Sequence, residues 1–206
     1  MHGASTSFPI ELRGSALARR VLRWFGWSLR FQGLPRLQGV IVVYPHTSNW
    51  DFPVGLLAKW AMGLEAKFLG KQSLFRIPVF GAWLRWLGGV PVDRSAAHGV
   101  VEQMVDLFER KRQSGEYFWL ALTPEGTRSW RPGWRSGFYR VEWKAQVPLM
   151  IAALDYGRKQ IRMIDVVELT GREEEDMGRI AGLLQGCTGL RADQAAPIRL
   201  EGGKGG

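Results

Sequence analysis

His46 and Asp51 are the residues of this sequence whose types and spacing most clearly suggest chemistry, and they stand just after an apolar segment. On one regular helix, five positions of separation would turn the two side chains about 140° apart, so they would not meet. They can meet when His46 lies in a loop and Asp51 lies in the first turn of the helix that follows. A carboxylate that accepts from one imidazole nitrogen leaves the other nitrogen free to take a proton, as in a general base with its orienting group. The alternative is a helix-capping Asp next to a structural His.

Two further groups of polar residues also follow apolar segments. In the first, Gly126 stands between Glu125 and Arg128, and glycine permits an unusual backbone angle or the close approach of a ligand. The second ends in Arg94, whose guanidinium can form a forked contact with a phosphate. The alternatives are an ordinary polar turn for the first group and a surface ion pair between Arg94 and Asp93 for the second.

The charge of the chain narrows the class of partner. Its 206 residues carry a formal net charge of +9, which suggests nucleic acid, an acidic membrane surface or a phosphorylated substrate. Ten Trp and ten Phe favour lipid, because amphipathic aromatic rings prefer the lipid–water interface. The sequence has no helix-turn-helix, zinc-finger or RRM signature, so we expect no nucleic-acid partner. The lone Cys187 excludes an internal disulfide and a Cys/His zinc cluster, and it fits a reducing compartment.

The elements that must position these residues alternate along the chain. Apolar or β-branched runs predict strands at 40–44, 66–69, 90–92, 117–122, 148–154 and 160–167. Helical periodicity predicts helices at 50–62, 73–87 (in two pieces, broken at Pro78), 97–112, 138–145 and 173–184. This alternation predicts a single α/β domain with a largely parallel central sheet flanked by helices. We expect no transmembrane helix, since no charge-free apolar stretch reaches about 18 residues.

An amphipathic helix over residues 12–31 is expected to precede the sheet. Five arginines fall on one of its faces, and Leu, Val, Trp and Phe side chains fall on the opposite face. This pattern fits a helix lying in a membrane interface, and it fits equally a helix packed on the domain's own core. We therefore expect an N-terminal interfacial helix region over 1–36 and the main domain over 37–206.

In order and spacing, these groups resemble the glycerolipid (lysophospholipid) acyltransferases of the PlsC type. The family's first block is a His and an Asp separated by four residues, as at His46 and Asp51, and its second block ends in an Arg, as at Arg94. Its third block, Glu-Gly-Thr-Arg-Ser, is matched letter for letter at 125–129, and its Val-Pro strand is matched at 147–148. The resemblance covers about 40–155. The chain departs from the family pattern at Pro45, Pro91 and Arg135, and blocks two and four help to form the acceptor site.

The resemblance implies transfer of a fatty acyl group from acyl-CoA or acyl-carrier protein to the hydroxyl of a lysophospholipid, in phospholipid biosynthesis. His46 would be the base and Asp51 its partner. The implied substrate-binding residues are Lys71, Arg94, Glu125, Gly126, Thr127 and Arg128, with the Gly126 amide a candidate for binding the oxyanion. No metal and no cofactor beyond the thioester donor would be needed.

The implied partners are an anionic membrane surface, a lysophospholipid and the acyl thioester donor. The implied location is the cytoplasmic face of the cell membrane, as a peripheral protein. Two other functions remain open: acyl transfer to a different acceptor, such as an aminolipid or a glycolipid, and a non-catalytic membrane-binding role.

Overall fold

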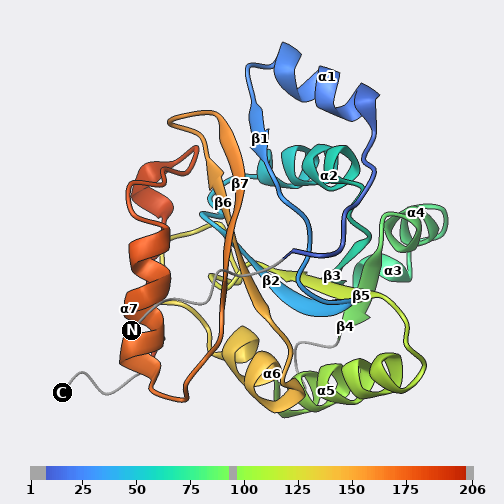
Figure 1. The fold of residues 1–206 in the computed structure, drawn as a ribbon, viewed down its shortest axis with the longest axis vertical. Helices are drawn as coiled ribbons and strands as arrows, with labels where there is room; N and C mark the ends of the chain where they lie inside the picture. The colour runs from blue at the N-terminus through green and yellow to red at the C-terminus, as the bar shows by residue number, and fades with distance from the viewer. Residues whose placement is uncertain (1–7, 93–96, 203–206) are drawn as a thin grey trace.

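The computed structural model describes residues 8–92 and 97–202, which form one seven-stranded sheet between two layers of helices (Figure 1). The strand order is β1-β7-β6-β2-β5-β3-β4, and every described neighbouring pair is parallel except β6–β7. The strands are β1 (Ser28–Arg30), β2 (Gln38–Tyr44), β3 (Ala66–Lys71), β4 (Gly89–Val92), β5 (Phe118–Leu122), β6 (Leu149–Asp155) and β7 (Gln160–Val167). The helices are α1 (Ala16–Trp24), α2 (Asp51–Met62), α3 (Gln72–Phe75), α4 (Phe80–Trp86), α5 (Ala97–Gln113), α6 (Gly137–Ala145), α7 (Glu173–Leu183) and the 3-10 turn η1 (Ala192–Gln194). The predicted α/β class with a largely parallel sheet is confirmed.

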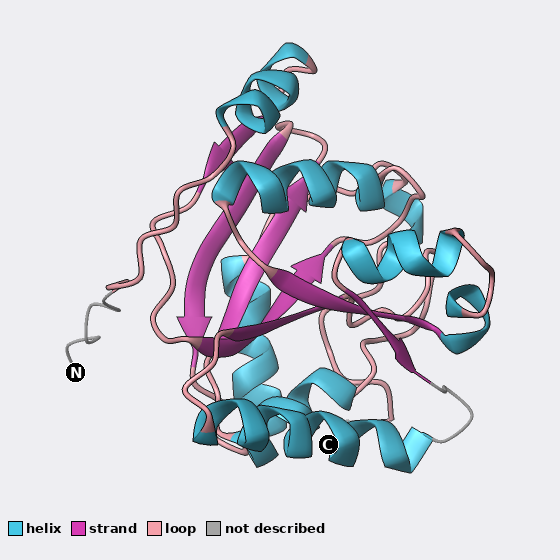
Figure 2. Ribbon diagram, turned by 90° about the vertical axis from the view of Figure 1, so that its right-hand side faces the viewer, coloured by secondary structure: helices cyan, strands magenta, loops and turns pink. Residues whose placement is uncertain are grey.

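Both faces of the central strand β2 are buried, which explains its continuous run of apolar residues. Ile41 packs with α1 and α2 on one face of the sheet. Val40 and Val42 pack with α5, α6 and α7 on the other face, as the alternation of side chains along a strand requires. Figure 2 shows α1 and α2 stacked along the first of these faces.

The loops that carry the polar groups lie at one edge of the sheet. Strands β2, β5, β3 and β4 are consecutive parallel neighbours, so their carboxyl ends point to the same edge. His46 follows β2, Glu125 follows β5 and Lys71 ends β3. In open parallel sheets, ligands bind beyond the carboxyl ends of the strands. Arg94 follows β4 in the sequence and lies outside the described residues.

The N-terminal helix is shorter than the expected 12–31, and the two ends of the expected range were wrong. The Ser15 hydroxyl accepts from the Ala18 amide and caps the start of α1, while Gly26, with φ of 80°, follows its end. Residues 28–30 are not helical but form β1, because they pair with β7 at the edge of the sheet. The region 1–36 thus contributes a strand to the same sheet as the rest of the chain.

One stripe of α1 packs on the protein, and another faces solvent. Ala18 and Leu22 are buried against α2, whereas Leu17, Phe25 and Trp24 are exposed, Trp24 by 82%. Packing on the domain's own core therefore accounts for only some of the apolar residues of this helix, and contact with a membrane would account only for the others. Among the residues that the structure describes, no helix is both long enough and apolar enough to cross a bilayer.

Candidate active site

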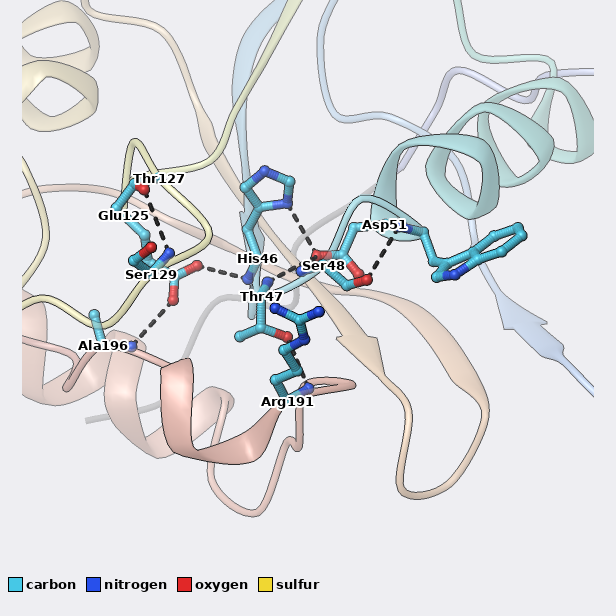
Figure 3. Close-up of polar contacts among 10 residues, drawn as sticks. His46, Thr47, Ser48, Asp51, Glu125, Thr127, Ser129, Arg191 and Ala196 are labelled. Carbon is cyan, nitrogen blue, oxygen red and sulfur yellow. Dashed lines mark hydrogen bonds and ion pairs between the residues drawn. The ribbon is translucent and has the colours of Figure 1, made fainter.

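His46 and Asp51 meet in the way that their spacing predicts. His46 lies in the loop after β2, Asp51 is the first residue of α2, and His46 Nδ1 lies 3.0 Å from Asp51 Oδ2 (Figure 3). The His46 side chain is 18% exposed and lines a cavity, whereas the Asp51 side chain is only 3% exposed. Since Nδ1 faces the carboxylate, Nε2 is the nitrogen left to take a proton.

Asp51 is held as a carboxylate by the loop that it closes. Its Oδ2 accepts the backbone amides of Thr47, at 2.8 Å, and Ser48, at 2.9 Å. Burial alone would raise the pKa of Asp51, but the hydrogen bonds from His46 and from the Ser48 amide outweigh it and lower the pKa. The start of α2 also favours a negative charge at this position. Asp51 is therefore ionised at neutral pH and can compensate the charge of a protonated imidazole.

Glu125 is a buried positioning residue in this structure. It is 1% exposed, and its two carboxylate oxygens accept from the backbone amides of His46, at 2.6 Å, and Ala196, at 3.1 Å. Figure 3 shows Glu125 between these two segments, pointing away from the imidazole ring. Burial raises its pKa to about 7, against the opposing effect of the two amides. Glu125 thus fixes the backbone of the candidate base.

The raised pKa of Glu125 predicts a stability that falls as pH rises. The folded protein keeps a proton on Glu125 up to about pH 7, while the unfolded chain releases it near the ordinary value of 4.5. The free energy of unfolding therefore decreases between these pH values, by about 3 kcal/mol from this group. Glu142, whose pKa burial also raises to about 7, contributes in the same window.

Urea unfolding at pH 5 and pH 8 measures this effect. We expect Glu125→Gln to be less stable than the wild type at pH 5, because one amide side chain cannot accept both backbone donors. We also expect it to lose less stability between the two pH values. The exposed Glu109→Gln serves as control and should keep the wild-type difference. An unchanged pH difference in Glu125→Gln would contradict the role of this carboxyl group.

A segment near the C-terminus holds the same loops from the other side. Within this C-terminal strap (residues 186–200), the amide of Arg191 donates to Thr47 Oγ1 at 3.2 Å. The Ala196 carbonyl accepts the hydroxyl of Tyr44 at 3.0 Å. Thr47 and Tyr44 flank the Pro45–His46 segment, so the strap holds the chain on both sides of His46. Figure 3 shows the contact between Arg191 and Thr47.

Gly189 allows the strap to approach the loop of Thr47 and His46 closely. A Cβ atom added there would lie 2.5 Å from Thr47 Oγ1, and Thr47 is fully buried. We expect Gly189→Ala to displace Thr47 and the adjacent His46, and to lower kcat about tenfold with a smaller change in KM, because small displacements at a site are costly. The matched control is Gly182→Ala in α7, where a Cβ atom meets nothing within 4 Å. Equal kcat values in the two variants would show that the strap does not position His46.

A cavity of about 990 Å³ opens beside His46 and Asp51. One part of it runs between α2 and the sheet and is apolar. Its walls include Ile41, Val43, Ala58, Met62, Ala66, Ala121, Ala152, Leu154, Ile161 and Met163. A hydrocarbon chain fits such a surface, since apolar burial is its main source of binding free energy.

The other part of the cavity is basic, and it contains most of the predicted binding residues. Lys71, Gly126, Thr127 and Arg128 all line it. The Gly126 amide, however, donates to the Thr123 carbonyl at 3.0 Å, so a turn already uses the group expected to bind an oxyanion. Glu125 is not among the lining residues. The structure therefore brings four of the six predicted binding residues to the cavity, buries Glu125 beneath it, and does not describe Arg94.

Arg135 and Arg140 also line this basic part, and neither was among the predicted site residues. The Arg135 side chain packs over Gly126, where an added Cβ atom would lie 3.0 Å from Arg135 Nε. Arg140 lies on the first turn of α6, and no motif in the sequence singled it out. Arg128, Arg135 and Arg140 form no ion pair with a described carboxylate, so an anionic ligand can take all three.

Groups of metal-ligating side chains and the lone cysteine also bear on the chemistry of this site. No group of three or more described His, Cys, Asp or Glu residues could hold a metal ion. The guanidinium of Arg162 donates to Cys187 Sγ at 3.2 Å, and Cys187 is not among the residues lining the cavity. Burial raises the pKa of the Cys187 thiol. A thiol in this state is a poor nucleophile.

Several known proteins are similar to this chain. A family model described as Acyltransferase matches residues 28–154. The 1-acyl-sn-glycerol-3-phosphate acyltransferase of Escherichia coli (strain K12) is 37% identical over 117 residues, which cover 53% of this chain and 44% of that protein. The chloroplastic 1-acyl-sn-glycerol-3-phosphate acyltransferase BAT2 of Brassica napus is 28% identical over 122 residues, covering 58% of this chain and 35% of that protein.

The matched segment thus spans less than half the length of either curated relative. Among solved structures, the crystal structure of the 1-acyl-sn-glycerophosphate (LPA) acyltransferase PlsC from Thermotoga maritima has a TM-score of 0.51 and 19% identity. The likeness covers 81% of this chain and 73% of that structure, and it supports the fold. Because the family model matches more than half of the sequence, the chain belongs to the acyltransferase family.

Proposed function

We propose that this protein transfers a fatty acyl group from a thioester donor to the hydroxyl group of a lysophospholipid, with lysophosphatidic acid as the acceptor. The observation that carries the proposal is the His46–Asp51 pair, which opens onto a cavity with an apolar part and a basic part. The apolar part suits an acyl chain, and the arginines that form no ion pair with a described carboxylate suit a phosphate. The names of the curated relatives, which are 1-acyl-sn-glycerol-3-phosphate acyltransferases, support the same acceptor.

In the proposed reaction, Nε2 of His46 removes the proton from the acceptor hydroxyl. The hydroxyl oxygen attacks the thioester carbonyl, the new C–O bond forms, and the C–S bond breaks. The proton then passes from the imidazolium to the leaving thiolate, and Asp51 compensates the positive charge while His46 carries it. A thioester is already activated, so no covalent acyl-enzyme is needed. The raised pKa of Cys187 and its place outside the cavity lining agree with direct transfer.

The acceptor phosphate would bind in the basic part of the cavity, to Lys71, Arg128, Arg135 and Arg140, with Arg94 as a further candidate. Glu125 would act through His46 and would not touch the substrate. The donor is acyl-CoA or acyl-carrier protein. We propose no metal and no further cofactor.

We place the reaction at a membrane surface, because the acceptor is a membrane lipid. One candidate contact with anionic lipid is made by the exposed Leu17 and Trp24 of α1 and by Phe25 directly after it, together with the arginines of the same helix. The cytoplasmic face fits the single cysteine of the chain, which is reduced there.

The test is an assay of the purified protein with a panel of acceptors and donors. Lysophosphatidic acid and lyso-lipids without a phosphate are each offered with acyl-CoA and with acyl-carrier protein. We expect product with lysophosphatidic acid and at least tenfold lower kcat/KM with phosphate-free acceptors. Efficient transfer to a phosphate-free aminolipid or glycolipid would replace the proposed acceptor, and no transfer in any combination would favour a membrane-binding role without catalysis.

A further inference from the structure

An exposed aromatic ridge lies beside the mouth of the cavity, on α3, α4 and the turn between them. It consists of Leu74, Ile77, Val79, Phe80, Trp83 and Trp86, all of which are exposed. Trp86 is 74% exposed, and the centroid of its ring lies 6.3 Å from the ring centroid of Trp60 on α2. In a monomer surrounded by water, so many neighbouring large apolar side chains mark an interaction surface.

The turn in the middle of the ridge has a strained backbone, and it exposes an apolar side chain to solvent. Val79 has φ of 64° and ψ of −56°, and the Phe80 amide donates across it to the Pro78 carbonyl at 2.6 Å. This is a γ-turn of the strained kind, and a β-branched residue rarely adopts positive φ. Val79 is nevertheless 84% exposed, so burial within the described protein does not explain why this conformation is held. Strained backbone of this kind is concentrated at sites where a protein meets a ligand or a partner.

The charged residues near the ridge are basic, which favours an anionic partner. Residues 66–92 contain no Asp and no Glu, but they contain Lys67, Lys71, Arg76 and Arg85. By contrast, the first turn of α7 holds four acidic residues and lies on the opposite side of the sheet from α4 (Figure 1). Exposed Trp and Phe among basic side chains fit the headgroup region of an anionic bilayer, where aromatic rings lie between water and hydrocarbon and each basic residue adds attraction.

The ridge also adjoins the substrate cavity. Leu74 belongs to the ridge and to the cavity wall, where Leu84 of α4 and Phe52 of α2 also lie. A lipid drawn from a bilayer in contact with the ridge would therefore pass from α3 directly into the cavity. Figure 2 shows α2 and α4 on the same side of the molecule.

We propose that the aromatic ridge of α3 and α4 inserts into the interfacial layer of an anionic bilayer and aligns the cavity mouth with the lipid surface. The proposal rests on the proposed function for the identity of the lipid substrate, but membrane binding through the ridge is measured without catalysis. It assigns the docking role to α3–α4, in addition to any contact that α1 makes.

The test is flotation of the protein with vesicles of phosphatidylcholine alone and of phosphatidylcholine with phosphatidylglycerol. We expect the wild type to bind the anionic vesicles, and a Val79→Ser/Trp86→Ser variant to bind them at least tenfold more weakly. Trp143→Ser is the matched control, because Trp143 is a half-exposed tryptophan on α6, outside the ridge, and it should bind like the wild type. Arg76→Gln should weaken binding to anionic vesicles only.

A second measurement separates docking from folding and from chemistry. The ridge variant should keep the wild-type rate on a short-chain acceptor dissolved as monomers, and lose at least tenfold when the acceptor is embedded in vesicles. Wild-type flotation of the ridge variant would overturn the proposal. A wild-type dimer that the ridge substitutions convert to a monomer would also overturn the proposal, because a second copy of the chain would then cover the ridge. If the wild type floats through the ridge but transfers no acyl group, the proposed function fails and the docking surface stands.

Discussion

Replacing His46 by Ala is expected to lower kcat about 10³-fold, the largest single effect that the structure predicts. General base catalysis contributes about 10²- to 10⁴-fold, and no other described imidazole lines the cavity to substitute for it. The variant should bind acceptor and donor almost as well as the wild type, because His46 contributes little of the cavity wall. The measurement is kcat and KM with labelled acyl donor, at saturating acceptor and across pH.

The fold should survive this substitution. The backbone amide of His46, which donates to Glu125, is kept in His46→Ala, and the lost side chain is partly exposed. An unchanged thermal unfolding midpoint and unchanged vesicle flotation would show that only the chemistry is lost. If more than a tenth of the wild-type kcat remains in a folded variant, His46 is not the base.

The sequence predicted the pair because two independent patterns agreed there. The β-branched run over 40–44 indicated a strand buried on both faces, and residues directly after such a strand lie at the carboxyl edge of the sheet. The spacing of His46 and Asp51 then required a loop followed by a helix start, which is what β2 and α2 provide. The same reasoning located the loop at 125–129, whereas Lys71 was expected only from the resemblance to the acyltransferase family.

The C-terminal strap could not be predicted in this way. Its contacts with Thr47 and Glu125 are made by the backbone amides of Arg191 and Ala196, and every residue other than proline carries an amide. It also lies outside residues 28–154, the range matched by the family model. A backbone contact between distant segments leaves no signal in residue types.

The errors near the N-terminus have a similar origin. Residues 28–30 fit the helical pattern of the segment before them, and only pairing with β7, some 130 positions later, makes them a strand. Tertiary pairing of this kind overrides a local pattern. Gly26 was the one local sign that the helix ends early, since its φ of 80° is costly for most other residues.

Replacing Asp51 by Asn tests the partner of the base and is expected to lower kcat by about 10²- to 10³-fold. The backbone N–H groups of Thr47 and Ser48 favour the orientation in which the side-chain oxygen of the asparagine faces them. That oxygen can then still accept from both N–H groups and from His46. The geometry is then kept, and what disappears is the negative charge. Without it, the imidazolium that forms as the hydroxyl loses its proton is no longer compensated, and the transition state is destabilised.

The pH dependence separates this explanation from a purely structural one. Loss of the carboxylate disfavours the protonated imidazole, so the acid limb of the pH profile of kcat/KM should move to lower pH in Asp51→Asn. The exposed Asp106→Asn on α5 is the control for removing one negative charge, and its profile should match the wild type. A variant that loses activity with an unmoved acid limb and a lowered unfolding midpoint would show that Asp51 holds the loop in place without acting on His46. A moved limb with unchanged stability would show that its charge takes part in the proton transfer.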